Sequence, residues 1–136
     1  MAADSQFLTT PKVGQALIST ANANRDGTGT IGTVLTAGAS GSEVWWLKAK
    51  ARGTTTAGMI RVFLHDGTGY RGLLAEIPVT ANTPSATIPT WEATIPLTVP
   101  VNSDVVLPLA LPNLWSIRAA TEKAESFDIM VAGGDF

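Results

Sequence analysis

Proline spacing constrains the fold of this sequence more than any other feature. Seven of the eight prolines stand between positions 78 and 112, one every few residues. Each proline lacks the N–H of a helical hydrogen bond and clashes with the preceding turn, so no α-helix can run through this stretch. Elsewhere, short runs rich in Thr, Val and Ile are separated by Gly, Asn and Asp. Such runs favour strands joined by turns, and the sequence therefore predicts an all-β fold.

The runs predict eight or nine strands in an antiparallel β-sandwich or a barrel. Alternation over 43–51 places Trp45 and Leu47 on one face, and Trp46 and Lys48 on the other. Helix formers gather only in 119–126, which is too short for an isolated helix and fits a hairpin loop equally well. The expected strands are 13–20, 30–36, 43–51, 58–66, 70–79, 86–95, 105–109, 114–121 and 127–131.

The length indicates one domain. A chain of 136 residues has the size of a single ordinary domain. We expect one sandwich over 13–136, preceded by an N-terminal arm over 1–12. The arm carries two apolar side chains, Phe7 and Leu8, which need a surface to pack on, either on a neighbouring molecule or on their own sheet.

The charge content excludes a nucleic-acid partner, and the hydropathy excludes a membrane partner. Charged residues make up 15% of the chain, the net charge is −2, and Lys and Arg form no cluster. Because an average chain is about 25% charged and nucleic-acid binders carry basic patches, we expect no nucleic-acid partner. No apolar run reaches the length of a membrane-spanning helix, so we expect no membrane partner. The sparse charge indicates a surface that is partly covered in an assembly.

A glycine-rich motif, D-G-T-G-x-x-G, occurs twice, starting at Asp26 and at Asp66. Both copies match the dinucleotide-binding pattern G-x-G-x-x-G, but that pattern needs a strand–turn–helix unit, and this sequence predicts no such helix. Asp-Gly supplies the positive φ of a tight turn, so we interpret the copies as two hairpin turns. The two aspartates could share a metal ion only if the turns met in space.

No set of residues indicates catalysis. His65, the one histidine, stands beside Asp66, and neighbouring strand residues point to opposite faces, so the pair forms no triad. Residues 38–42, Gly-Ala-Ser-Gly-Ser, lack the spacing of a nucleophile elbow. One His and no Cys leave no zinc site, and the acids show no calcium-loop pattern. We expect no enzymatic activity, no cofactor and no metal.

The four tryptophans suggest a binding surface. Trp45 and Trp46 are adjacent in a strand, so they are expected to face opposite ways, one of them into the core. Trp91 stands in the proline-rich region. An exposed tryptophan on a sandwich either stacks on a sugar or anchors a protein interface. The candidate contacts with a partner or with other copies are Phe7, Leu8, Trp46 and Trp91.

Strand and turn patterns along nearly the whole chain carry a resemblance. They are QFLTTPK at 6–12, LTAGASGS at 35–42, GTTTAGMIRVFLHDG at 53–67, EIPV at 76–79, PNLWSIRAAT at 112–121 and AGGDF at 132–136. Together they resemble the small head decoration, or cement, proteins of tailed bacteriophages and their prophages.

The resemblance implies a jelly-roll or related β-sandwich that forms homotrimers on the outer surface of the capsid in the virion. Such trimers bridge subunits of the major capsid protein lattice and stabilise the shell against internal DNA pressure. The family has no active site to transfer to this sequence. Two alternatives stay open: a structural protein of the tail or baseplate, and a carbohydrate-binding β-sandwich module.

Overall fold

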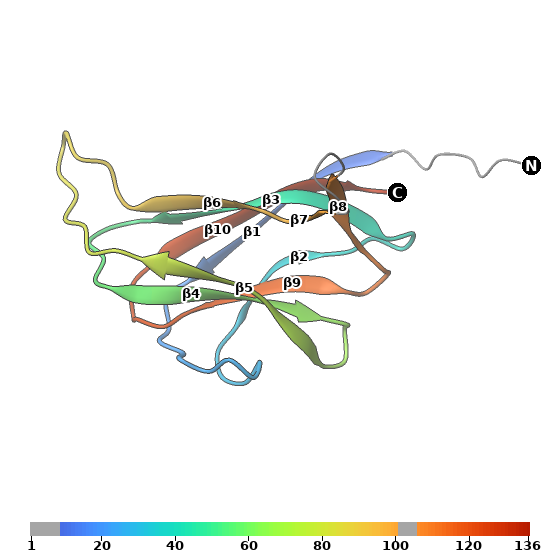
Figure 1. The fold of residues 1–136 in the computed structure, drawn as a ribbon, viewed down its shortest axis with the longest axis horizontal. Helices are drawn as coiled ribbons and strands as arrows, with labels where there is room; N and C mark the ends of the chain where they lie inside the picture. The colour runs from blue at the N-terminus through green and yellow to red at the C-terminus, as the bar shows by residue number, and fades with distance from the viewer. Residues whose placement is uncertain (1–8, 101–105) are drawn as a thin grey trace, which may run out of the picture.

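The chain folds into two antiparallel β-sheets that pack face to face (Figure 1). The computed structural model describes residues 9–100 and 106–136. In these residues it contains ten strands and no helix, and hence no helix long and apolar enough to span a membrane. The predicted all-β antiparallel sandwich is confirmed, while the jelly-roll arrangement within that class stays a prediction.

The larger sheet has six strands in the order β1-β10-β3-β8-β7. Strand β6 pairs with the second half of β3, and β8 pairs with the first half, so both lie on the same edge of β3. The strands are β1 (Thr10–Ile18), β3 (Ser42–Ala51), β6 (Glu92–Pro96), β7 (Thr98–Pro100), β8 (Val106–Leu111) and β10 (Phe127–Asp135).

The smaller sheet has four strands in the order β2-β9-β4-β5. Its members are β2 (Gly32–Thr36), β4 (Gly58–His65), β5 (Tyr70–Val79) and β9 (Ser116–Thr121). The core lies between the two sheets, where inward-facing side chains from both are fully covered. Its largest members include Leu47, Ile60, Val62, Ile117, Phe127, Ile129 and Val131.

The outer face of the four-stranded sheet is more buried than its sequence predicts. Side chains alternate along β4, so Arg61, Phe63 and His65 face away from the core, and the two polar members predict that this face is wet. Arg61 and Phe63 are nevertheless only 4% and 1% exposed. The segment 21–31, between β1 and β2, crosses this face. Arg25 in that segment forms a 2.5 Å ion pair with Glu76 of β5, and Arg61 lies 3.6 Å from the same carboxylate oxygen. The segment thus covers part of this face.

Several strand boundaries differ from the sequence prediction. Strand β1 begins at Thr10 and not at 13, because Thr10 to Lys12 already pair with the last residues of β10. The predicted strand 86–95 is wrong before position 92: Ser85 and Ile88 close a turn between Pro84 and Pro89. Strand β7 was not expected. Residues 119–126 form neither a helix nor a hairpin, because β9 runs to Thr121 and the chain then crosses to the other sheet.

Candidate assembly surface

An apolar row crosses the outer face of the six-stranded sheet. Val13 of β1 pairs with Ala132 of β10, Ala132 pairs with Trp46 of β3, and Trp46 pairs with Pro96 of β6. Directly opposed residues in antiparallel strands point to the same side of a sheet, so the four side chains form one line. Val13 is 73% exposed and Trp46 is 39% exposed. We call these four residues the apolar row.

The face becomes charged with distance from the apolar row. Two residues further along the strands, Lys48 stands beside Met130, and after two more, Lys50 stands beside Asp128. Both lysines bond the same carboxylate on β6: Nζ of Lys48 lies 3.2 Å, and Nζ of Lys50 3.6 Å, from oxygens of Glu92. The hydrogen bond from Lys48 is the main reason that the pKa of Glu92 is lowered. The charged side chains of this face are therefore paired with one another, and the apolar row is the part of the face that carries no charge.

A β-bulge places two adjacent tryptophans on this same face. In the pairing of β3 with β10, Trp46 opposes Ala132, and the next pair joins Val44 to Gly133, so Trp45 has no partner in β10. An extra residue of this kind lets two neighbours point the same way. Trp45 is 45% exposed, while Val44 and Leu47 on either side are fully buried. The expectation that one of the two tryptophans lies in the core is therefore wrong.

The exposed tryptophans border a shallow groove of about 490 Å³. The groove runs over β3 and β6 at the edge of the sheet, and we call it the tryptophan groove. Its apolar walls have one cationic side chain among them, Lys48, whose charge is already paired with Glu92. The groove is lined by Trp45, Trp46, Lys48, Thr94, Ile95 and Pro96.

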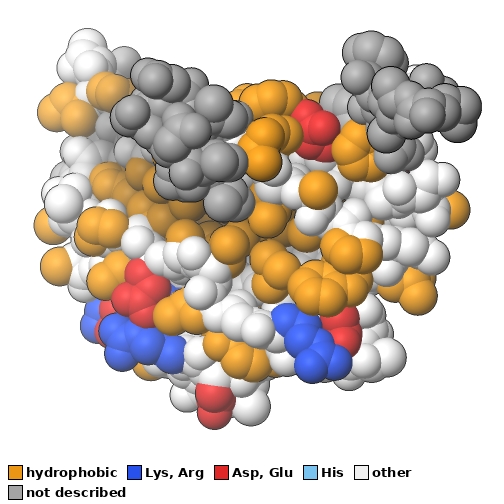
Figure 2. All heavy atoms as spheres, turned by 45° about the vertical axis from the view of Figure 1, so that its right-hand side comes forward, with side chains coloured by type: hydrophobic (Ala, Val, Ile, Leu, Met, Phe, Trp, Pro, Cys, Tyr) orange, Lys and Arg blue, Asp and Glu red, His pale blue; other side chains and the backbone are white. Residues whose placement is uncertain are grey.

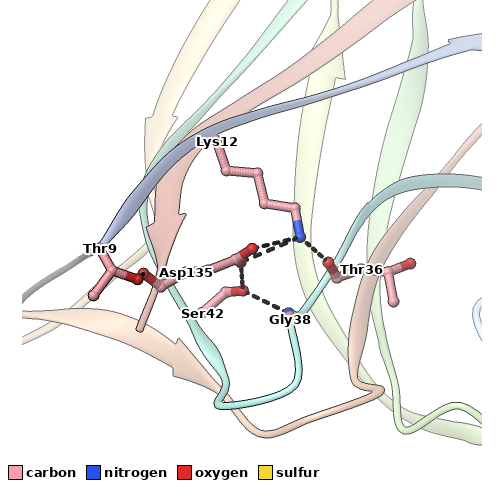
Figure 3. Close-up of polar contacts among 6 residues, drawn as sticks. All are labelled: Thr9, Lys12, Thr36, Gly38, Ser42 and Asp135. Atoms are coloured by element: carbon pink, nitrogen blue, oxygen red, sulfur yellow. Dashed lines mark hydrogen bonds and ion pairs between the residues drawn. The ribbon is translucent and has the colours of Figure 1, made fainter.

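A polar cluster fixes the end of the sheet next to the apolar row (Figure 3). Lys12 of β1 donates hydrogen bonds to the Thr36 carbonyl at 2.6 Å and to Asp135 of β10 at 3.2 Å. Ser42 donates a hydrogen bond to Asp135, and its own oxygen accepts one from the Gly38 amide at 3.0 Å. The bond from Ser42, with a smaller contribution from Lys12, lowers the pKa of Asp135. The cluster holds β1, β10 and the β2–β3 turn together where the chain enters the sandwich.

Apolar side chains are gathered on the surface and not evenly scattered. Figure 2 shows them across the middle of one face, with most of the visible charged side chains grouped below them and further acidic atoms above them. Exposed patches of this kind mark interaction sites more often than isolated apolar residues do. Among the described residues, the large exposed apolar side chains are Val13, Leu17, Trp45, Trp46, Tyr70, Ile88, Leu107 and Leu114.

The four predicted contact residues have different outcomes. Trp46 is exposed in the centre of the apolar row. Trp91 is half-buried, and its ring packs edge-to-face on Phe127 with 5.7 Å between ring centres, so part of its surface serves the core. Phe7 and Leu8 lie outside the described residues. Trp45 was missed as a surface residue, and the signal that could have found it is the glycine pair at 133–134, since glycines in a strand mark bulges.

The turns that begin at Asp26 and Asp66 meet in space, but they form no metal site. Each carboxylate accepts hydrogen bonds inside its own turn, from the Thr28 amide in one copy and from the Thr68 and Gly69 amides in the other. In the part of the chain that the structure describes, no three acidic or histidine side chains are placed to hold a metal ion. No protein-family model matches this sequence, and no curated protein is similar to it at a significant level.

Proposed function

We propose that this chain is a structural virion protein, a decoration protein that binds the outside of a phage head as a homotrimer and stabilises the major capsid protein lattice. The observation that carries the proposal is the apolar row together with Trp45, the second outward tryptophan, next to it in β3. The resemblance to head decoration proteins supplies the class of partner.

The apolar row has the composition of a protein interface. Interfaces concentrate tryptophan and apolar side chains at their centre and place polar groups at the rim. Here Trp46 stands between Ala132 and Pro96, with Val13 at the end of the row, and the charged residues begin only two positions further along the strands. Burial of such a surface stabilises a complex in proportion to the apolar area that leaves water.

The rim charges favour an association that depends little on salt. Lys48 and Lys50 are paired with Glu92, and Arg52 bonds Asp128 through two hydrogen bonds of 2.9 Å. Charges that are already paired within one molecule attract a partner only weakly, and added salt changes that attraction little. Binding is therefore expected to depend on apolar burial, and a trimer multiplies weak contacts by high effective concentration.

The test uses the double variant Trp45→Ala/Trp46→Ala and the matched control Ile88→Ala. Ile88 is also an exposed apolar residue, 49% accessible, but it lies in the loop before β6. Sedimentation reports the mass in solution, and co-sedimentation with heads that lack the protein reports attachment. We expect the wild type and I88A to form trimers and bind heads, and the tryptophan variant to lose one or both. A wild-type protein that is monomeric and does not bind heads would overturn the proposal.

The N-terminal residues are tested by a separate variant in the same experiment. We propose Phe7 and Leu8 as further contacts with the coat or with a neighbouring copy, so the double variant F7A/L8A is expected to weaken head binding. If it binds like the wild type, the assignment of these two residues fails while the proposal for the sheet face stands. An electron cryomicroscopy map of the particle would also distinguish a head position from one on the tail or baseplate.

A second candidate function is carbohydrate binding, and one observation favours it. Trp45 and Trp46 are both exposed on one face and border a groove, which is the arrangement that sugar-stacking modules use. If this candidate is correct, polysaccharides will quench or shift tryptophan fluorescence, and the double tryptophan variant will abolish the change. Flat titrations across a panel of glycans would exclude it.

A further inference from the structure

The two copies of the D-G-T-G-x-x-G motif line one cavity on the outer face of the four-stranded sheet, opposite the apolar row. The first copy contributes Gly27 and Gly29, and the second contributes Gly69 and Tyr70. Strands β4 and β9 provide the floor. The cavity measures about 310 Å³ and is lined by Gly27, Gly29, Ile31, Phe63, Leu64, His65, Gly69, Tyr70 and Arg118.

Specific contacts hold the cavity open. The Tyr70 hydroxyl donates a hydrogen bond of 3.2 Å to the Arg25 carbonyl, and the side-chain Nδ2 of Asn22 donates to the carbonyls of Thr28 and Thr30 at 2.9 and 3.0 Å. Gly27 has φ 77°, and a Cβ there would lie 2.6 Å from Cγ of Tyr70. Only glycine fits this close approach in this backbone conformation. The two turns are thus fixed against each other, and the cavity is formed before any ligand arrives.

Arg118 gives the cavity its charge. Seven of the nine Lys and Arg side chains form an ion pair, and the two that have none with a described residue are Arg118 and Lys123. The Arg118 Nε donates a 3.0 Å hydrogen bond to Ser116 Oγ, which orients the guanidinium. No acidic residue lines the cavity. An unpaired guanidinium in a pocket without acids attracts an anion.

The remaining lining side chains add one polar and two aromatic groups. The Gly67 amide donates to Nδ1 of His65 at 3.0 Å, so a neutral His65 carries its proton on Nε2 and is a donor there. The Phe63 ring is almost fully buried and packs edge-to-face on Tyr70, with ring centres 5.8 Å apart. The cavity therefore combines donors for an oxyanion with aromatic surface for an apolar body.

We propose that this cavity binds a small carboxylate built on a ring, of the size and chemistry of an acidic monosaccharide. A planar carboxylate matches the paired N–H donors of a guanidinium, and the Tyr70 ring, which Phe63 supports from below, offers a surface to the less polar face of a sugar ring. The volume lies at the lower end for small-molecule sites, which fits one ring and not a dinucleotide. This inference is independent of the proposed capsid role, because it concerns the opposite sheet.

The test titrates the full chain with D-glucuronate and follows backbone amide signals by NMR. We expect saturable shifts at Gly27, Gly69 and neighbouring residues, and none with D-glucose, which has the ring without the carboxylate. Inorganic phosphate distinguishes an oxyanion site from a ring site: the proposal expects it to bind more weakly than glucuronate. No saturable shift with glucuronate, or binding of phosphate as tight as that of glucuronate, would overturn the proposal.

Two variants and one control locate the binding. Arg118→Gln removes the cation and is expected to weaken glucuronate binding about tenfold or more. Gly69→Ala adds a methyl group at the cavity wall, where no atom lies within 4 Å, and is expected to weaken binding without harming the fold. Arg71→Gln is the control, because Arg71 is paired with Asp66 and does not line the cavity. Equal loss in the control, or unchanged affinity in both cavity variants, contradicts the assignment.

Discussion

Gly14 stands where the edge strand β1 passes closest to β2 of the other sheet. A Cβ at this position would lie 2.6 Å from Cβ of Leu35 and would overlap the carbonyl oxygen of Val34. Real Cβ atoms do not approach this closely, so any side chain here must push the two sheets apart. A single missing side chain therefore lets the sandwich close along this edge.

Gly14→Ala tests this closure at the scale of one methyl group. We expect the substitution to lower the free energy of unfolding by about 1–3 kcal/mol, the usual cost of overpacking. The matched control is Gly72→Ala in β5, where a Cβ would meet no atom within 4 Å. The control is expected to change stability by no more than about 1 kcal/mol, and in the stabilising direction, because alanine restricts the unfolded chain. Urea unfolding measures both, and equal effects would contradict the role of Gly14.

Among the elements, strands with strict alternation were predicted well. The expected strand 70–79 is found with the same bounds, and 58–66 differs by one residue. Prediction failed in β3, because alternation alone cannot show a bulge. The bulge at Trp45 depends on Gly133 of β10, where a Cβ would collide with the Glu43 carbonyl and lie 2.9 Å from its carbon. That contact joins residues far apart in sequence, so no pattern within β3 itself records it.

Contacts between residues far apart in sequence also limit what the sequence could predict about the sites. The motif copies at 26–32 and 66–72 were predicted as hairpin turns. The second is a hairpin, because it joins the paired strands β4 and β5, but the prediction is wrong for the first, which connects β1 of one sheet to β2 of the other. Both copies contain a glycine with positive φ after the aspartate. That they meet and line one cavity follows from the path of the segment 21–31 across the sheet. Trp46 was predicted as a surface residue from its polar neighbours in the strand, whereas Trp45 was predicted on the opposite face, because a regular strand was assumed.

Deleting Trp45 is expected to remove the bulge and preserve the fold. Without it, Trp46 points outward between the buried side chains of Val44 and Leu47, which is the alternation of a regular strand. The main loss is the 2.9 Å hydrogen bond from the Leu97 amide to the Trp45 carbonyl. We expect a loss of about 1 kcal/mol. Deleting Lys48 is the contrasting variant, because it forces one half of β3 to turn its buried side chains outward.

For the Lys48 deletion we expect a loss of about 3 kcal/mol or more, since Val44 and Leu47 or Ala49 and Ala51 would leave the core. Chemical denaturation of the two deletion variants side by side measures the difference. If the two deletion variants unfold at the same denaturant concentration, Trp45 is not the extra residue of a bulge.

At the scale of the whole molecule, the fold shifts the pKa values of several acidic side chains in the same direction. Among the described residues, the pKa values of six carboxyl groups are lowered, and each of these carboxylates accepts hydrogen bonds in the native fold. For Asp66 the donors are the amides of Thr68 and Gly69, and then Arg71. The six are Asp26, Asp66, Glu76, Glu92, Asp128 and Asp135. The few charges of this chain thus stabilise turns and strand ends, including the two turns that line the cavity.

These lowered pKa values predict acid sensitivity. A carboxyl group whose pKa is lower in the folded chain than in the unfolded chain stabilises the fold fully above its unfolded value, near 4. That contribution is lost as the pH falls through the folded value. We therefore expect the urea midpoint to be flat from pH 7 to about 5 and to fall steadily below about pH 4. Asp66→Asn is the informative variant, because Asp66 has the largest shift: its loss of stability at pH 7 should shrink towards pH 2. A difference between variant and wild type that stays constant over this range would show that the Asp66 charge does not stabilise the fold.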